Sequence, residues 1–239
     1  LLAHIPAGIG WGSSGPIGGI HAQLIERHSG KIISPYYAMG FNIGIFIGGI
    51  LAGFILSNTM NPTFVFIILF FLSILVSFTI YMNGLPKDLD FKGEGEKLKI
   101  PEKNVLIFGF LLFVIFGSNG IIIDWSALWF TKELNAPLYL ASLGLIFLSF
   151  GGIFANLFSN QLIKLFSEKI VGCYFVIFGS LILFSSIIIG NFYFILITFF
   201  FYGFLTANLV PIIIRQAVKH SSESIPTTVT NLITMGFSA

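Results

Sequence analysis

The chain alternates between long apolar runs and short polar connections. Of its 239 residues, 56% are hydrophobic and 9% are charged. A helix that crosses the hydrocarbon core of a membrane needs about 20 mostly apolar residues. We therefore expect an all-α, polytopic transmembrane helical bundle. Its candidate spans are residues 5–25, 33–57, 63–83, 104–130, 138–161, 170–189, 192–214 and 226–239.

Both ends of the sequence interrupt this pattern. The chain begins LLAHIPAGIG without Met, and its last apolar run is too short to cross a membrane. We therefore expect a piece of a longer membrane protein.

The basic residues fall on alternate connections. Lys132 is the exception, and the other eleven of the twelve Lys and Arg residues lie on one side of the alternating path. An excess of Lys and Arg marks the cytoplasmic side of membrane proteins. The first span then runs inward and the fourth runs outward.

The only long polar connection covers residues 84–103 and contains several Gly, Lys and Glu residues. We interpret it as a cytoplasmic linker between two bundles. Residues 1–83 then hold three spans, and residues 104–239 hold four spans and a truncated fifth. Its mixed charges are typical of a solvated surface and do not indicate nucleic-acid binding.

Small residues recur at helical spacing within several spans. Such positions let helix backbones approach closely in lipid. The spacing alone does not separate static packing from helices that rock against each other. The packing candidates are Gly40, Gly44, Gly48, Gly117, Gly120 and Gly151.

Asp124 is one of the few acids inside an apolar run, GIIIDWSALWF. It shares a helix face with Gly117 and Gly120, in the outer half of the fourth span. A charge in a span costs at least about 2.5–3.5 kcal/mol at mid-membrane, and it usually faces a bundle interior or water. Asp124 is therefore either a helix-end acid bonded to a neighbouring helix or a substrate or proton site. Trp125 and Trp129 suit a membrane-interface belt.

Further polar residues lie in or near the spans. Asn208 precedes Pro211, whose missing N–H and ring can kink the helix. Each of these residues either bonds between helices or lines a solute pathway. The pathway candidates besides Asp124 are Asn119, Asn42, Asn208 and Trp11, and the candidates for a cytoplasmic gate are Glu26, Arg27 and Lys164.

Enzyme and metal signatures are missing from the sequence. There is no GxSxG, HExxH or GxxxxGK[ST] motif. The single Cys173 predicts no disulfide framework, and the four histidines form no spaced metal motif. We therefore expect neither a cofactor nor a metal site nor catalysis.

Three stretches resemble the major facilitator superfamily, and they look closest to a bacterial branch of sugar-permease-like inner-membrane members. DWSALWFTKELNAPLYLASLGLIFLSFGGIFANLFSNQLIKLF is similar to helices seven and eight of that branch. HAQLIERHSGKIISPYYAMGFNIGIFIGG is similar to the end of helix four and to helix five, and GFLTANLVPIIIRQA to helix ten. The chain would then cover helices four to the start of eleven of a twelve-helix fold.

The resemblance implies a secondary transporter that moves a small solute by alternating access, as a monomer among the lipids of a bacterial inner membrane. Proton coupling is common in the superfamily, and Asp124 and Glu26 are the carboxylates available for it. The segment NLFSNQLIKLFSEK departs from the family's charged pattern after helix eight, which puts a charged latch there in doubt. The alternatives are a membrane-embedded enzyme or assembly factor and a non-transporting sensor.

Overall fold

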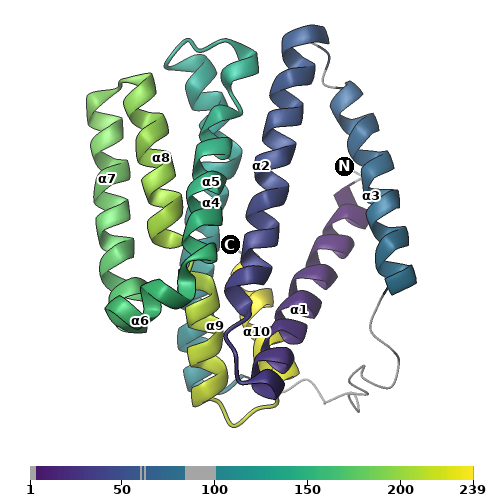
Figure 1. Ribbon diagram of the computed structural model, residues 1–239, viewed down its shortest axis with the longest axis vertical. Helices are drawn as coiled ribbons and strands as arrows, with labels where there is room; N and C mark the ends of the chain where they lie inside the picture. The colour runs from purple at the N-terminus through teal and green to yellow at the C-terminus, as the bar shows by residue number, and fades with distance from the viewer. Residues whose placement is uncertain (1–3, 60, 62, 84–100, 239) are drawn as a thin grey trace.

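A computed structural model describes residues 4–59, 61, 63–83 and 101–238. Throughout this part of the chain the regular secondary structure is helical, and successive long helices run in opposite directions (Figure 1). Among these described residues, five helical stretches are long and apolar enough to cross a membrane: Ser34–Asn58, Lys103–Lys132, Leu138–Leu157, Ser159–Ile189 and Phe192–His220. The prediction of an all-α transmembrane bundle is confirmed.

The first three helices match the first three predicted spans closely. Gly30 ends the first helix in a left-handed backbone conformation (φ +66°), which glycine adopts without a Cβ penalty. The third helix lies at the edge of the bundle (Figure 1). These helices are α1 (His4–Ser29), α2 (Ser34–Thr59) and α3 (Thr63–Asn83).

The second part of the chain is divided into more elements than the spans predicted. They are α4 (Lys103–Lys132), η1 (Leu138–Leu140), α5 (Leu143–Leu157), α6 (Ser159–Lys169), η2 (Ile170–Tyr174), α7 (Phe175–Ile189), α8 (Phe192–Thr206), α9 (Leu209–His220) and α10 (Ile225–Phe237). In Figure 1, α6 lies across the end of the bundle between α5 and α7.

Two predicted spans differ from the observed helices. The span 138–161 is broken at Phe158 (φ −96°, ψ 12°), and α6 continues where a loop was expected. The span 192–214 is broken after Thr206 and then continues as α9 to His220. Pro211 explains the second break, because its ring clashes with the carbonyl four residues earlier, that of Ala207.

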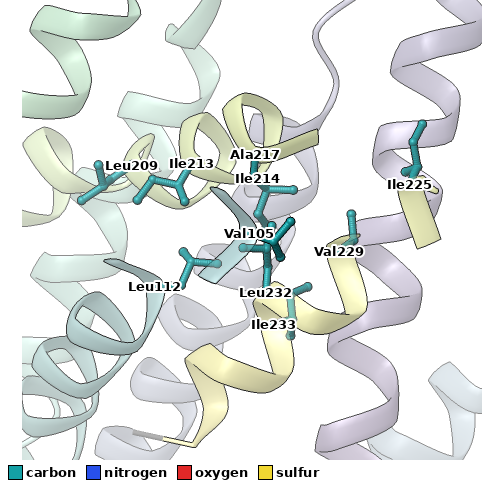
Figure 2. Packing of buried hydrophobic residues seen from close by; sticks show 10 residues of the cluster. All are labelled: Val105, Leu112, Leu209, Ile213, Ile214, Ala217, Ile225, Val229, Leu232 and Ile233. Atoms are coloured by element: carbon teal, nitrogen blue, oxygen red, sulfur yellow. The ribbon is translucent and has the colours of Figure 1, made fainter. Parts of the chain in front are cut away.

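A hydrophobic core joins α4, α9 and α10 (Figure 2). This core lies toward the end of the bundle where α1 ends and α4 and α10 begin. We call this end of the bundle the basic end, after its exposed cations Arg27, Lys31, Lys103 and Lys219. Ile20 and Leu24 of α1 pack against the same core, so it also connects the first part of the chain to the second. The buried core residues are Val105, Leu112, Leu209, Ile213, Ile214, Ala217, Ile225, Val229, Leu232 and Ile233.

Helices α5 and α8 cross with their backbones in contact. A Cβ atom on Gly151 would collide with the carbonyl oxygen of Phe200, and a Cβ on Gly203 would collide with that of Leu148. Small residues at a crossing permit this approach, and van der Waals packing then stabilises the pair. Phe130, Ile195, Leu196 and Phe199 form a second core next to this crossing.

Two carboxylates tie the start of α4 to the connection between α9 and α10. The Ser222 backbone N–H and hydroxyl both donate to Glu102, and Glu223 Oε1 accepts from the Glu102 N–H at 2.9 Å. Asn231 donates to the other oxygen of Glu223 at 3.2 Å. The hydrogen bonds from Ser222 lower the pKa of Glu102, because they favour its charged form.

Candidate functional site

Three charged side chains from separate helices meet near the basic end. Arg215 of α9 donates from Nη1 to Glu168 Oε1 of α6 at 2.8 Å. Its Nε lies 4.0 Å from Glu26 Oε2 of α1. The side chains of Arg215, Glu26 and Glu168 are only 18%, 10% and 24% exposed. This ion-pair cluster links the first part of the chain to the second at one end of the bundle.

Glu26 also fixes the start of the following helix. Its Oε1 accepts from the Ile33 N–H at 2.7 Å and from both the N–H and the hydroxyl of Ser34 at 2.6 Å. Gln23 adds a bond to the Ser34 hydroxyl at 2.8 Å. A carboxylate is stabilised at a helix N-terminus by the unpaired N–H groups and the helix dipole. The hydrogen bonds from the start of α2 therefore fix the Glu26 carboxylate in its position beside Arg215.

Glu168 follows a sharp turn of the backbone. Ser167, just before it, has φ 68° and ψ 156°, a conformation that is otherwise almost confined to glycine. Glu168 bonds Arg215 with one carboxylate oxygen and the Gln216 amide with the other. The turn thus places α6 against two neighbouring polar residues of α9.

The Ser167 backbone leads to a stability prediction. We expect Ser167→Gly to raise the free energy of unfolding by about 1 kcal/mol, because residues with a Cβ pay about 1–3 kcal/mol in this region. Ser167→Ala is the matched control, since it keeps a Cβ. Thermal unfolding of the purified protein in detergent measures both variants, and a glycine variant no more stable than the alanine variant would contradict the assignment of strain.

The gate candidates have different surroundings. Glu26 lies in the ion-pair cluster, whereas Arg27 is exposed beside it. Lys164 is exposed on α6 and forms no ion pair with any described residue. The gate role of these residues stays a prediction.

Sequence reasoning missed Arg215 and Glu168 as members of the cluster. The predicted span ended at residue 214, so Arg215 was counted with the loop. The buried Ile212, Ile213 and Ala217 show that the apolar face of α9 continues past it. The apolar residues on both sides of Arg215 in the sequence were the available signal that the helix continues past residue 214. Glu168 also provides a charged contact in the segment where a charged latch was in doubt.

Besides the ion-pair cluster and the shared core, two helix pairs bring the first and second parts of the chain into close contact. Between α1 and α10, a Cβ on Gly19 would lie 2.9 Å from Ile233. Between α2 and the η1–α5 region, a Cβ on Gly53 would lie 3.0 Å from Ser142. Glycines therefore allow close contact on both seams.

The predicted packing glycines fall into different environments. Gly151 lies at the α5–α8 crossing, and Gly117 is half-buried on α4. At Gly40, Gly44, Gly48 and Gly120, no described atom other than those of the same stretch of helix lies within 4 Å of the position a Cβ would take. Packing at these four positions stays a prediction that requires an element outside the described residues.

Two of the pathway candidates contact neighbouring helices. Asn208 is buried between α8 and α9 and donates to the Ala155 carbonyl at 3.1 Å. The Asn42 amide lies against α5, where a Cβ on Gly152 would be 2.7 Å from Asn42 Oδ1. Asn42 itself donates to the Ala38 carbonyl of its own helix at 3.1 Å.

The remaining candidates lie on α4 and α1. Asp124 is exposed and Asn119 is half-buried, and the side chain of neither forms a hydrogen bond or ion pair with another described group. Trp11 lies on α1, with its side chain outside the described residues. Trp125 is 61% exposed, as an interface anchor requires, but Trp129 packs beside Phe130 in the second core. Among the described residues no contact joins the pathway candidates to one another, so a shared pathway stays a prediction.

Comparison with known proteins adds an independent line of evidence. The family model of the Major Facilitator Superfamily matches residues 7–239. The chain belongs to the major facilitator superfamily. A protein of Yersinia pestis that is named an uncharacterized MFS-type transporter is 25% identical over 231 residues. That alignment covers 91% of this chain but only 56% of the relative, so the chain spans little more than half of the relative's length. No solved structure matches.

Membership of the superfamily confirms the resemblance found in the sequence. It also identifies the long apolar helices as parts of a multi-pass membrane protein. Within the described residues of this superfamily member, no three His, Cys, Asp or Glu side chains gather as a metal site. The interactions observed in the ion-pair cluster are ion pairs and hydrogen bonds between helices.

Proposed function

We propose that the intact protein is a secondary transporter that moves a small solute by alternating access. The match to the superfamily over residues 7–239 carries this proposal. Residues 1–83 and 104–239 would be the two moving units, with residues 84–103 as the cytoplasmic linker between them. In such transporters two bundles rock against each other around a central site. The glycine-lined seams of α1 with α10 and of α2 with α5 support this division.

The described conformation would be the one closed at the cytoplasmic side. The basic end is assigned to the cytoplasm by its positive charge. There the cluster of Glu26, Arg215 and Glu168 connects the two units, and Ile20 and Leu24 pack against the core of the second unit. Opening this side for solute release would separate Glu26 from Arg215. The cluster is thus proposed as the cytoplasmic gate.

The function can be tested on the intact protein in two stages. Thermal-shift screening with sugars, amino acids and drugs first finds solutes that stabilise the purified protein. Uptake of these solutes into proteoliposomes, with and without a proton gradient, then tests transport and coupling. If no solute of the panel raised the unfolding temperature and none was taken up, the transporter proposal would be withdrawn.

Asp124 gives the sharpest test of the pathway. An acid that is exposed on a membrane helix faces either water or a helix outside the described residues. We expect Asp124→Asn to reduce uptake by about tenfold or more, equivalent to at least about 1.4 kcal/mol of lost interaction, while the unfolding temperature stays unchanged. Initial uptake rates in proteoliposomes measure this effect.

The matched control is Glu133→Gln, which removes an exposed acid just after the end of the same helix. It should transport at the normal rate. Normal transport by the Asp124→Asn variant would exclude a pathway role for Asp124. A lowered unfolding temperature would instead assign the acid to helix packing.

A further inference from the structure

Four cations surround one open pocket at the basic end. The pocket has a volume of about 310 Å³ and is lined by residues of α1, of the α1–α2 connection and of α9. Arg27 and Lys31 come from the first part of the chain, and Arg215 and Lys219 from the second. Glu26 is the only acid among the described residues that line it, so the formal charge of this described lining is four positive minus one negative, or +3.

Glu26 offsets only one of the four positive charges of this pocket. Its Oε1 already accepts three hydrogen bonds at the start of α2. Its Oε2 is 4.0 Å from Arg215 Nε, which is beyond hydrogen-bond distance. When Glu168, the ion-pair partner of Arg215, is also counted, the formal charge of these described side chains is four positive minus two negative, or +2.

Arg215 has unused donors on one edge of its guanidinium group. Nη1 bonds Glu168, whereas Nε and Nη2 are buried and form no hydrogen bond with the described residues. Together Nε and Nη2 make the planar fork that binds two oxygens of a carboxylate or phosphate. Both atoms are buried, and Glu26 Oε2 lies 4.0 Å from Nε, so Arg215 contributes positive charge beside the pocket and not an open binding edge.

We propose that this pocket binds a phosphate-bearing anion, held by Arg27, Lys31 and Lys219 with Arg215 as the least exposed cation. A phosphate offers several strong acceptor oxygens, enough to engage cations from both sides of the seam at once. The phosphate could belong to an anionic lipid headgroup at the membrane surface or to a soluble phosphate compound. Both sources have the same chemistry at the site.

An anion in this pocket would link the two parts of the chain. Lys31 lies on the α1–α2 connection and Lys219 on α9, so one phosphate between them opposes separation of these elements. Given the proposed transport function, the bound anion favours the conformation that is closed at the basic end. Binding itself does not depend on transport and can be measured without a transport substrate.

The test compares two double variants of the intact protein. Lys31→Gln/Lys219→Gln removes one pocket cation from each side of the seam. Lys103→Gln/Lys169→Gln removes the same charge from exposed lysines outside the pocket. In nanodiscs of phosphatidylcholine, titration with inorganic phosphate reports a soluble source. In nanodiscs with increasing phosphatidylglycerol, the unfolding temperature at constant ionic strength reports a lipid source.

We expect binding in at least one of these two arms, weakened about tenfold by the pocket variant and less than about twofold by the control. Saturable phosphate binding identifies a soluble ligand, and stabilisation by phosphatidylglycerol alone identifies a headgroup. Equal losses in the two variants would show general charge attraction and overturn the site. Absence of an effect in both arms would overturn it as well, whatever solute the protein transports.

Discussion

Replacing Arg215 by glutamine opens the basic end of the bundle. The substitution leaves Glu26 and Glu168, which are 10% and 24% exposed, without their cation. Removing one partner of a buried ion pair is strongly destabilising, because the remaining charge is uncompensated. Partial exposure reduces the penalty through screening by water. We expect the closed conformation to lose about 1–3 kcal/mol.

The measurement is the reaction rate of a cysteine placed on the closed seam. Ala22 on α1 is 6% exposed, so Ala22→Cys should react slowly with maleimide while the basic end stays closed. Cys173 is exposed and must first be replaced by serine. In the Arg215→Gln variant the rate should rise about tenfold or more, since about 1.4 kcal/mol is a factor of ten.

A second substitution tests whether charge imbalance is the cause. Glu168→Gln added to Arg215→Gln removes one of the two uncompensated acids, so the labelling rate should fall back toward that of the parent protein. An unchanged rate in the Arg215→Gln variant would show that hydrophobic packing alone closes this end. A double variant that labels faster than the single variant would contradict the electrostatic explanation.

Gly203→Ala should separate α5 from α8. The new Cβ would collide with the backbone carbonyl oxygen of Leu148 and would lie 3.2 Å from its Cα. Backbone atoms inside a helix cannot move aside as a flexible side chain does, so the two helices must shift apart. Overpacking typically costs about 1–3 kcal/mol, and we expect the upper part of this range. Thermal unfolding in detergent measures the loss.

Gly172→Ala is the matched control for this prediction. A Cβ at Gly172 would lie 3.7 Å from Ile212, which is an ordinary van der Waals distance. Alanine also restricts the unfolded chain more than glycine does, so this variant should be neutral or slightly stabilised. Equal unfolding temperatures for Gly203→Ala and the parent protein would contradict the prediction, because they would show that α5 and α8 can move apart without loss of stability.

The elements that could be predicted depend on local physics. The apolar runs at residues 33–57, 63–83 and 104–130 match α2, α3 and α4 because a span must fill about 30 Å of hydrocarbon with apolar side chains. Pro211 likewise predicted a kink, because its ring clashes with the carbonyl group one helical turn earlier. The break at Phe158 had no comparable signal, because no proline lies within α5 or α6.

The site depended on contacts between distant segments. The sequence singled out Glu26, but Arg215 and Glu168 became its neighbours only through the packing of α1, α6 and α9. The same limit applies to glycine. Gly44 and Gly151 both have small residues four positions away, at Gly48 and Ala155, yet in the described structure only Gly151 faces a neighbouring backbone.

The resemblance of three stretches indicated the superfamily. The pattern of residues by itself determined a membrane-spanning, all-helical chain and predicted most of its positive charge on one side. Hydrophobic length and charge position suffice for this, since each acts along the chain without reference to a partner. Only the tertiary structure decided which polar groups meet, which glycines touch a backbone and where four cations line an open pocket. Those features depend on distances between helices, and helical periodicity sets the face of a residue but not the element opposite it.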